Sequence, residues 1–132
     1  MILEALIAIL IFSIGILAIV ALQAVSIKLA GDAKYRADAS LLAEELLGQM
    51  WTSDRVPANM LANYGSVAAG AGYTAWLANV RAALPGTVTN PPAVVVDTTA
   101  NTATTGTTTV TVRWQAPNDG LPHSHTVTAQ IR

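Results

Sequence analysis

The sequence predicts an α+β protein in which one long amino-terminal helix is followed by a small antiparallel β-sheet. The first observation is an apolar stretch, from Ala5 to Ile27, that contains neither a charged residue nor a proline. The second is that proline stays absent as far as Thr52, while the apolar residues change to a spacing of three and four. The third is a shift to valine and threonine after Pro91 and Pro92, a composition typical of strands.

The apolar stretch is long enough to cross a membrane. As a helix its roughly 23 residues would rise about 1.5 Å each and span about 35 Å, which exceeds the hydrocarbon core of a bilayer. A removable secretory signal fits less well, because its apolar part is usually about 7–15 residues long and follows a basic start. We expect residues 1–27 to form the membrane-spanning half of the long helix, and residues 28–132 to form a head outside the membrane.

Glu4 is the one charged residue at the start of this helix. A carboxylate beside apolar residues is costly unless a partner or interfacial water satisfies it. The next basic residue, Lys28, lies a full membrane thickness away along the helix. The nearest candidate cation is therefore a terminal amine, either that of Met1 or that of a neighbouring chain. The alternative is that Glu4 lies at the level of the lipid headgroups and has no specific role.

The helix is predicted to continue past the membrane and to end near Trp51 to Ser53. Apolar side chains recur on one face of this second half, which we expect to lie on the head: Ala39, Leu42, Ala43, Leu46, Leu47, Met50 and Trp51. Pro57 follows closely and excludes helical geometry at Val56, so the helix has to end before it.

The remainder of the head alternates turn signals with short elements. We expect a short helical turn over Ala58 to Tyr64, a small flexible segment over Gly65 to Gly72, and a helix over Thr74 to Leu84 that Pro85 and Gly86 end. Three strands are predicted at Ala93 to Asp97, Thr107 to Gln115 and His125 to Ile131. The alternation of Val110, Val112 and Trp114 with threonines predicts one face on the long helix and one in solvent.

Several functional classes are disfavoured by composition. Seven basic and eight acidic residues are scattered along the chain and give a formal net charge of −1, so no nucleic-acid partner is expected. The absence of cysteine excludes disulfides and thiol catalysis. His123 and His125 could offer two imidazoles to a metal from one strand face, but no third ligand stands near them. Ser124 lacks a nucleophile motif. We expect no metal, no cofactor and no enzymatic activity.

The amino-terminal residues carry a resemblance to a known family. A glutamate near the start of an apolar helix that continues through Ile11-Phe12-Ser13-Ile14-Gly15 resembles the type IV pilins and pseudopilins. Together with the later segment from Leu41 to Trp51, it is most similar to the PilV-type minor pilins. The resemblance is specific over roughly the first 50 residues, and after them it concerns only the order of long helix, connecting segment and sheet.

The resemblance implies how such a chain is processed and assembled. A prepilin peptidase would remove a short basic leader, the new amine would be methylated, and the subunit would leave the inner membrane for a helical fibre. In that family the glutamate matching Glu4 pairs with the terminal amine of a neighbouring subunit and is the fifth mature residue. It is the fourth here, so Met1 would be the second mature residue. Glu4 and Met1 would then set subunit position, and Phe12 and Gly15 would pack between helices.

Partners and location follow from the same resemblance. The expected partners are other major and minor pilin subunits, the inner membrane before assembly and the prepilin peptidase, with a host surface as a further candidate. The head would lie in the periplasm and later on the extracellular fibre. Charge alone favours the opposite orientation, because Lys28, Lys34 and Arg36 follow the apolar stretch and basic residues prefer the cytoplasmic side.

The sequence thus predicts a minor pilin that supports the priming of pilus assembly, with adhesion at the fibre tip as a candidate second role. The loops over Asn101 to Gly106 and Pro117 to Pro122 would face outward, toward other minor subunits or a host surface. Two alternatives stay open. One is a minor pseudopilin of a type II secretion system, and the other is a single-span membrane protein with a binding head, for which the apolar stretch alone would be sufficient.

Overall fold

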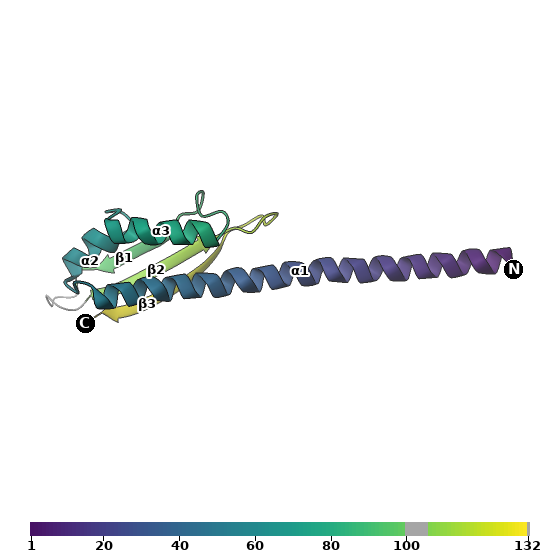
Figure 1. The fold of residues 1–132 in the computed structure, drawn as a ribbon, viewed down its shortest axis with the longest axis horizontal. Helices are drawn as coiled ribbons and strands as arrows, with labels where there is room; N and C mark the ends of the chain where they lie inside the picture. Colours follow the sequence, from purple (N-terminus) through teal and green to yellow (C-terminus); the bar gives the residue numbers. More distant parts are fainter. Residues whose placement is uncertain (100–105, 132) are drawn as a thin grey trace. The chain divides into compact units, whose positions relative to one another are not determined.

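The computed structural model describes residues 1–99 and 106–131 and has the predicted α+β layout (Figure 1). Its elements, in chain order, are α1 (Ile2–Thr52), α2 (Pro57–Tyr64), α3 (Ala71–Ala83), β1 (Ala93–Asp97), β2 (Gly106–Trp114) and β3 (His123–Ile131). The chain forms two compact units, Met1–Lys34 and Tyr35–Arg132. The expected limit of the membrane-spanning stretch at residue 27 stays a prediction.

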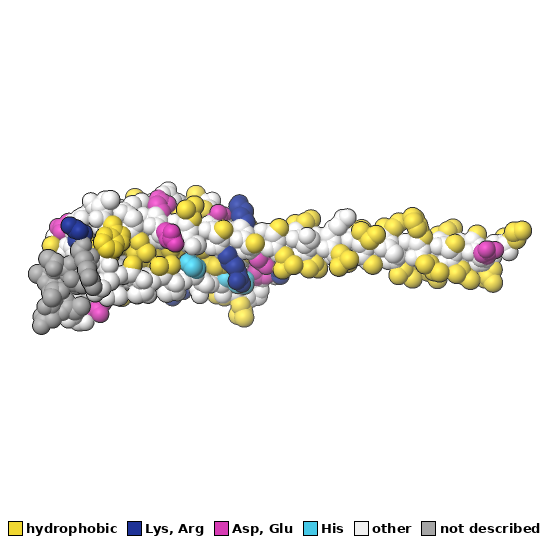
Figure 2. Space-filling view, turned by 90° about the horizontal axis from the view of Figure 1, so that it is seen from below, with side chains coloured by type: hydrophobic (Ala, Val, Ile, Leu, Met, Phe, Trp, Pro, Cys, Tyr) yellow, Lys and Arg dark blue, Asp and Glu magenta, His cyan; other side chains and the backbone are white. Residues whose placement is uncertain are grey.

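The first unit is the amino-terminal part of α1, and its apolar side chains are exposed on every side. Figure 2 shows one view of the hydrophobic side chains along it. Four successive residues, Ile9 to Phe12, are each between 60 and 69% exposed, and successive helical residues are turned by about 100° from one another. An 18-residue window of this helix has a mean hydropathy of 3.1 and none of it is buried. A helix that is apolar all round is typical of a membrane span or of the centre of a larger assembly. This part of α1 therefore suggests a membrane anchor.

The sheet of the second unit has three antiparallel strands in the order β1-β2-β3. The central strand β2 alternates strictly between buried and half-buried residues, and Val110, which is fully buried, lies opposite both Val94 and Val127. On the other face, the hydroxyls of Thr111 and Thr126 lie 3.2 Å apart across the strands. The predicted division of β2 into an apolar face and a threonine face is confirmed.

The core lies between the inner face of the sheet, α3 and the carboxyl-terminal part of α1. The helix α1 contributes the buried residues Ala39, Leu42, Ala43, Leu46, Leu47 and Met50. The indole nitrogen of Trp76, which is 1% exposed, donates a hydrogen bond to the Leu42 carbonyl at 2.8 Å and ties α3 to α1. Burying one side chain of this kind contributes about 1.5–3 kcal/mol. Trp51 departs from the expected apolar face and is 45% exposed, because it lies in the last turn of α1 and is rotated away from Met50.

In the segment from Gly65 to Gly72, the glycines lie in close contact with α2, whereas Val67 is 97% exposed. The expected flexibility of this segment stays a prediction. The amide of Gly72 donates to the Asn63 side chain at 3.0 Å. A Cβ at Gly70 would clash with the Ala62 carbonyl, and one at Gly72 would clash with the ring of Tyr64. These glycines allow α2 and α3 to approach closely. As a result α3 begins at Ala71, three residues before its predicted start.

The connection from β2 to β3 is a turn closed by local hydrogen bonds. The amide of Asp119 donates to the Ala116 carbonyl at 3.1 Å. Asn118 adopts a φ of 67°, in the left-handed region that asparagine tolerates better than most residues. Strand β3 then begins at His123, two residues before its predicted start and directly after Pro122. The other predicted outward loop, Asn101 to Gly106, lies outside the described residues apart from Gly106.

Candidate functional site

The amino-terminal end of α1 carries the two residues for which an assembly role is predicted. Met1 precedes the helix and its carbonyl accepts a hydrogen bond from the Ala5 amide at 3.1 Å. Glu4 is exposed in the first turn, where the helix dipole favours a negative side chain by about 0.3–1 kcal/mol. Among the described residues, none forms an ion pair with Glu4. Its carboxylate is therefore available to a second chain.

Phe12 and Gly15, for which a role in helix packing is predicted, lie on the exposed surface of the same stretch. The Phe12 side chain is 69% exposed, and a Cβ added at Gly15 would meet no atom within 4 Å. Between them the hydroxyl of Ser13 donates to the Ile9 carbonyl at 2.7 Å, so its polar group is satisfied within the helix. This surface could receive a neighbouring apolar helix without exposing an unpaired hydroxyl to it.

A second cluster, made of aromatic and titratable side chains, lies on the head, where β2 ends and β3 begins. Trp114 and His123 are paired in the sheet register, and their rings stack with centroids 5.8 Å apart and an angle of 26° between planes. The Nε2 atom of His123 lies 3.1 Å from a carboxylate oxygen of Asp119. The turn before β3 therefore positions His123 from one side while the Trp114 ring supports it from the other.

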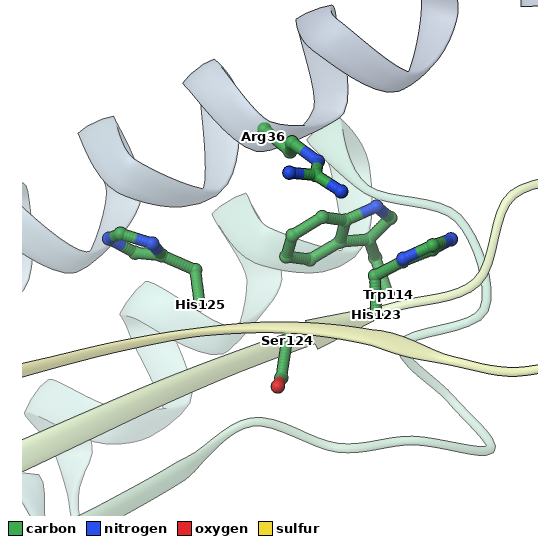
Figure 3. Close-up of a pocket in the computed structure, with 5 residues that line it drawn as sticks. All are labelled: Arg36, Trp114, His123, Ser124 and His125. Carbon is green, nitrogen blue, oxygen red and sulfur yellow. The ribbon is translucent and has the colours of Figure 1, made fainter. Parts of the chain in front are cut away.

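His123 and His125 point to the same face of β3, as the one-residue spacing predicts, whereas Ser124 between them points away (Figure 3). The Nε2 atom of His123 is engaged with Asp119. Among residues 1–99 and 106–131, no three His, Cys, Asp or Glu side chains come together in a way that could hold a metal ion. The Nε2 atom of His125 is buried and has no hydrogen-bonding partner in this part of the chain.

These residues border a half-open cavity of about 170 Å³ (Figure 3). Its lining comes from Arg36, Trp114, His123, Ser124 and His125. The spacing in the sequence points to the two histidines but not to Arg36 and Trp114 as their neighbours. No local pattern could have revealed this contact, because α1 and the end of β2 are far apart in the sequence and meet only through the packing of the core.

Three titratable groups on the head have pKa values moved by their surroundings. Hydrogen bonds from the Val56 amide and the Asn59 side chain hold the pKa of Asp54 below its ordinary value. Two hydrogen bonds from Thr99 do the same for the pKa of Asp97. Burial raises the pKa of Tyr73, an effect that the charge of Arg81 opposes. Asp54 and Asp97 organise turns, and Tyr73 donates to the Pro92 carbonyl at 2.9 Å, so all three are structural.

No family model, curated protein or solved structure matches this chain. Its function is therefore inferred from its own residues.

Proposed function

We propose that this chain is a minor subunit of a type IV pilus, of the PilV type, that supports the priming of pilus assembly. The observation that carries the proposal is the make-up of α1. Glu4 stands in its first turn, its amino-terminal part exposes apolar side chains on every side, and its carboxyl-terminal part supplies one wall of the head's core. The resemblance of residues 1–51 to PilV-type pilins supports the same function.

The mechanism follows from the cost of exposing such a helix to water. The membrane holds the subunit through the apolar part of α1 until assembly. In the fibre, the same surfaces pack against one another and exclude water, with Phe12 and Gly15 at the contacts. A carboxylate in that environment costs several kcal/mol when unpaired. Glu4 is therefore stable only where a neighbouring terminal amine meets it, and this requirement fixes the position of each subunit.

The first experiment is to measure the mass of the amino-terminal peptide of the native protein, from membranes and from sheared surface fibres. The expected result is a processed, methylated amine, one residue before Met1 or on Met1 itself, in both fractions. Presence in sheared fibres favours a pilus over the pseudopilus of a type II secretion system. An unprocessed start found only in membranes would refute the proposal and favour a membrane-anchored binding domain.

A second experiment tests Glu4 directly, with Glu44→Ala as a control that removes an exposed glutamate elsewhere on the same helix. Glu4→Ala should insert into membranes normally but enter fibres about tenfold less well, because a lost charge-assisted hydrogen bond is worth about 1.5–3 kcal/mol. Glu44→Ala should enter them like the unaltered chain. The amounts in membrane and fibre fractions are compared by immunoblot. Equal incorporation of both variants would rule out pairing through Glu4.

A further inference from the structure

The cavity on the head contains two hydrogen-bond donors that have no acceptor. Trp114 is 2% exposed, and its indole N–H makes no hydrogen bond with any described residue. Trp76 shows the usual arrangement, since its indole N–H is bonded to the Leu42 carbonyl. Figure 3 shows the indole nitrogen of Trp114 on the side of its ring that faces the Arg36 guanidinium. Arg36, which is exposed, also has no ion pair or hydrogen bond within the described residues.

No carboxylate is among the residues that line the cavity, and Arg36 is the permanently charged group among them. His123 is already engaged with Asp119, the carboxylate that lies at this end of the head. His125 adds a ring whose Nε2 atom lacks a partner within residues 1–99 and 106–131. An acceptor entering the cavity would complete the hydrogen bonding of the Trp114 N–H and neutralise Arg36 at the same time.

We propose that this pocket binds a single carboxylate group, held by the guanidinium of Arg36 and the indole N–H of Trp114. A guanidinium presents a planar fork of donors that matches a carboxylate. One permanent positive charge also balances a monoanion, whereas a phosphate dianion would remain partly uncompensated. On the proposed pilus function, the carboxylate is that of an aspartate or glutamate side chain on a neighbouring chain, which the half-open cavity would admit. Only this assignment of the source rests on the proposed pilus function.

The test follows the indole N–H signals of the full chain in detergent micelles by ¹⁵N–¹H NMR. Its three tryptophans give three indole signals, which single Trp→Phe variants assign. Sodium acetate is added at constant ionic strength against sodium chloride. The Trp114 signal should move and saturate as acetate binds. The Trp76 signal should stay in place because its N–H is already bonded, and the exposed Trp51 should respond equally to both salts.

Variants identify the second donor. Arg36→Gln should abolish the saturable shift, and Arg36→Lys should weaken binding about tenfold, because lysine keeps the charge but lacks the planar fork. The matched control is Arg113→Gln, which removes an arginine from β2 on the face opposite to Trp114, where it donates to the Pro91 carbonyl at 3.2 Å. This control should bind acetate like the unaltered chain. Loss of the shift in Arg113→Gln as well would mean that overall charge, and not the pocket, is responsible.

Titrations with other anions identify the ligand. A Trp114 shift that chloride reproduces would overturn the proposal, and so would phosphate binding more tightly than acetate. Glutamate blocked at its amino and α-carboxyl groups distinguishes the two sources of a carboxylate. Binding as tight as that of acetate would support a side chain on a neighbouring chain, whereas binding of acetate alone would overturn that source and indicate a small free acid. None of these titrations requires a fibre, so a negative result would overturn the carboxylate pocket and leave the proposed pilus function standing.

Discussion

Thr108 offers a sharp test of the core, because its hydroxyl is buried without a partner. The residue is 0% exposed on the inner face of β2, and its Oγ1 atom has no hydrogen bond within the described residues. An unsatisfied buried polar group costs about 1–3 kcal/mol. Valine has nearly the same shape and favours strands. Thr108→Val should therefore raise the free energy of unfolding by about 1 kcal/mol, or the midpoint temperature by about 4–8 °C for a domain of this size.

The matched control makes the same chemical change where the hydroxyl is satisfied. Thr87 is 2% exposed and its Oγ1 atom donates to the Leu84 carbonyl at 3.3 Å. Thr87→Val should lower the free energy of unfolding by about 0.5–1.5 kcal/mol, the net value of a typical hydrogen bond. Unfolding of the full chain in micelles is followed by tryptophan fluorescence. If Thr108→Val destabilised the head as much as Thr87→Val, the hydroxyl of Thr108 would have a partner and the reasoning would be wrong.

Two further predictions concern pH and helix packing. Because burial raises the pKa of Tyr73 above its ordinary value of 10.0, the stability it contributes is complete below pH 10.0 and is lost as the pH rises through the higher folded value. Tyr73→Phe should lower the free energy of unfolding by about 1 kcal/mol at neutral pH, because the hydrogen bond to the Pro92 carbonyl is lost. The variant should also lose less stability than the unaltered chain as the pH rises above 10.0. An equal loss of stability in the two proteins would refute this. Gly15→Ala should stabilise α1 by about 1 kcal/mol yet reduce fibre incorporation, measured by immunoblot of sheared fibres, if Gly15 packs against a neighbour. Gly31→Ala is the control, since a Cβ there also meets no atom within 4 Å, and equal incorporation of both variants would contradict packing at Gly15.

Features set by local periodicity could be predicted from the sequence. The alternation in β2 and the buried face of α1 from Ala39 to Met50 appear where they were expected, because each depends only on the geometry of its own element. The end of α1 near Thr52 could also be predicted, because Pro57 excludes helical geometry at Val56 and the helix has to end before it.

Features that depend on contacts between distant residues could not be predicted. One such feature is the close approach of α2 to Gly70 and Gly72, which leaves no room for a side chain at either position. The pocket depends on a meeting of Arg36 with Trp114 that no local pattern encodes. The structure places Glu4, Met1, Phe12 and Gly15 on exposed surface, and their assembly roles stay predictions.

The way the core is assembled also has a consequence for the biosynthesis of the chain. The buried face of α1 ends at Met50, while the last residue that covers this core, Ile131, follows 81 positions later. At about 5–20 residues per second, a ribosome needs about 4–16 s to synthesise the residues between these two positions. The leucines and the methionine on this face of α1 therefore complete their core contacts only once β3 has been made.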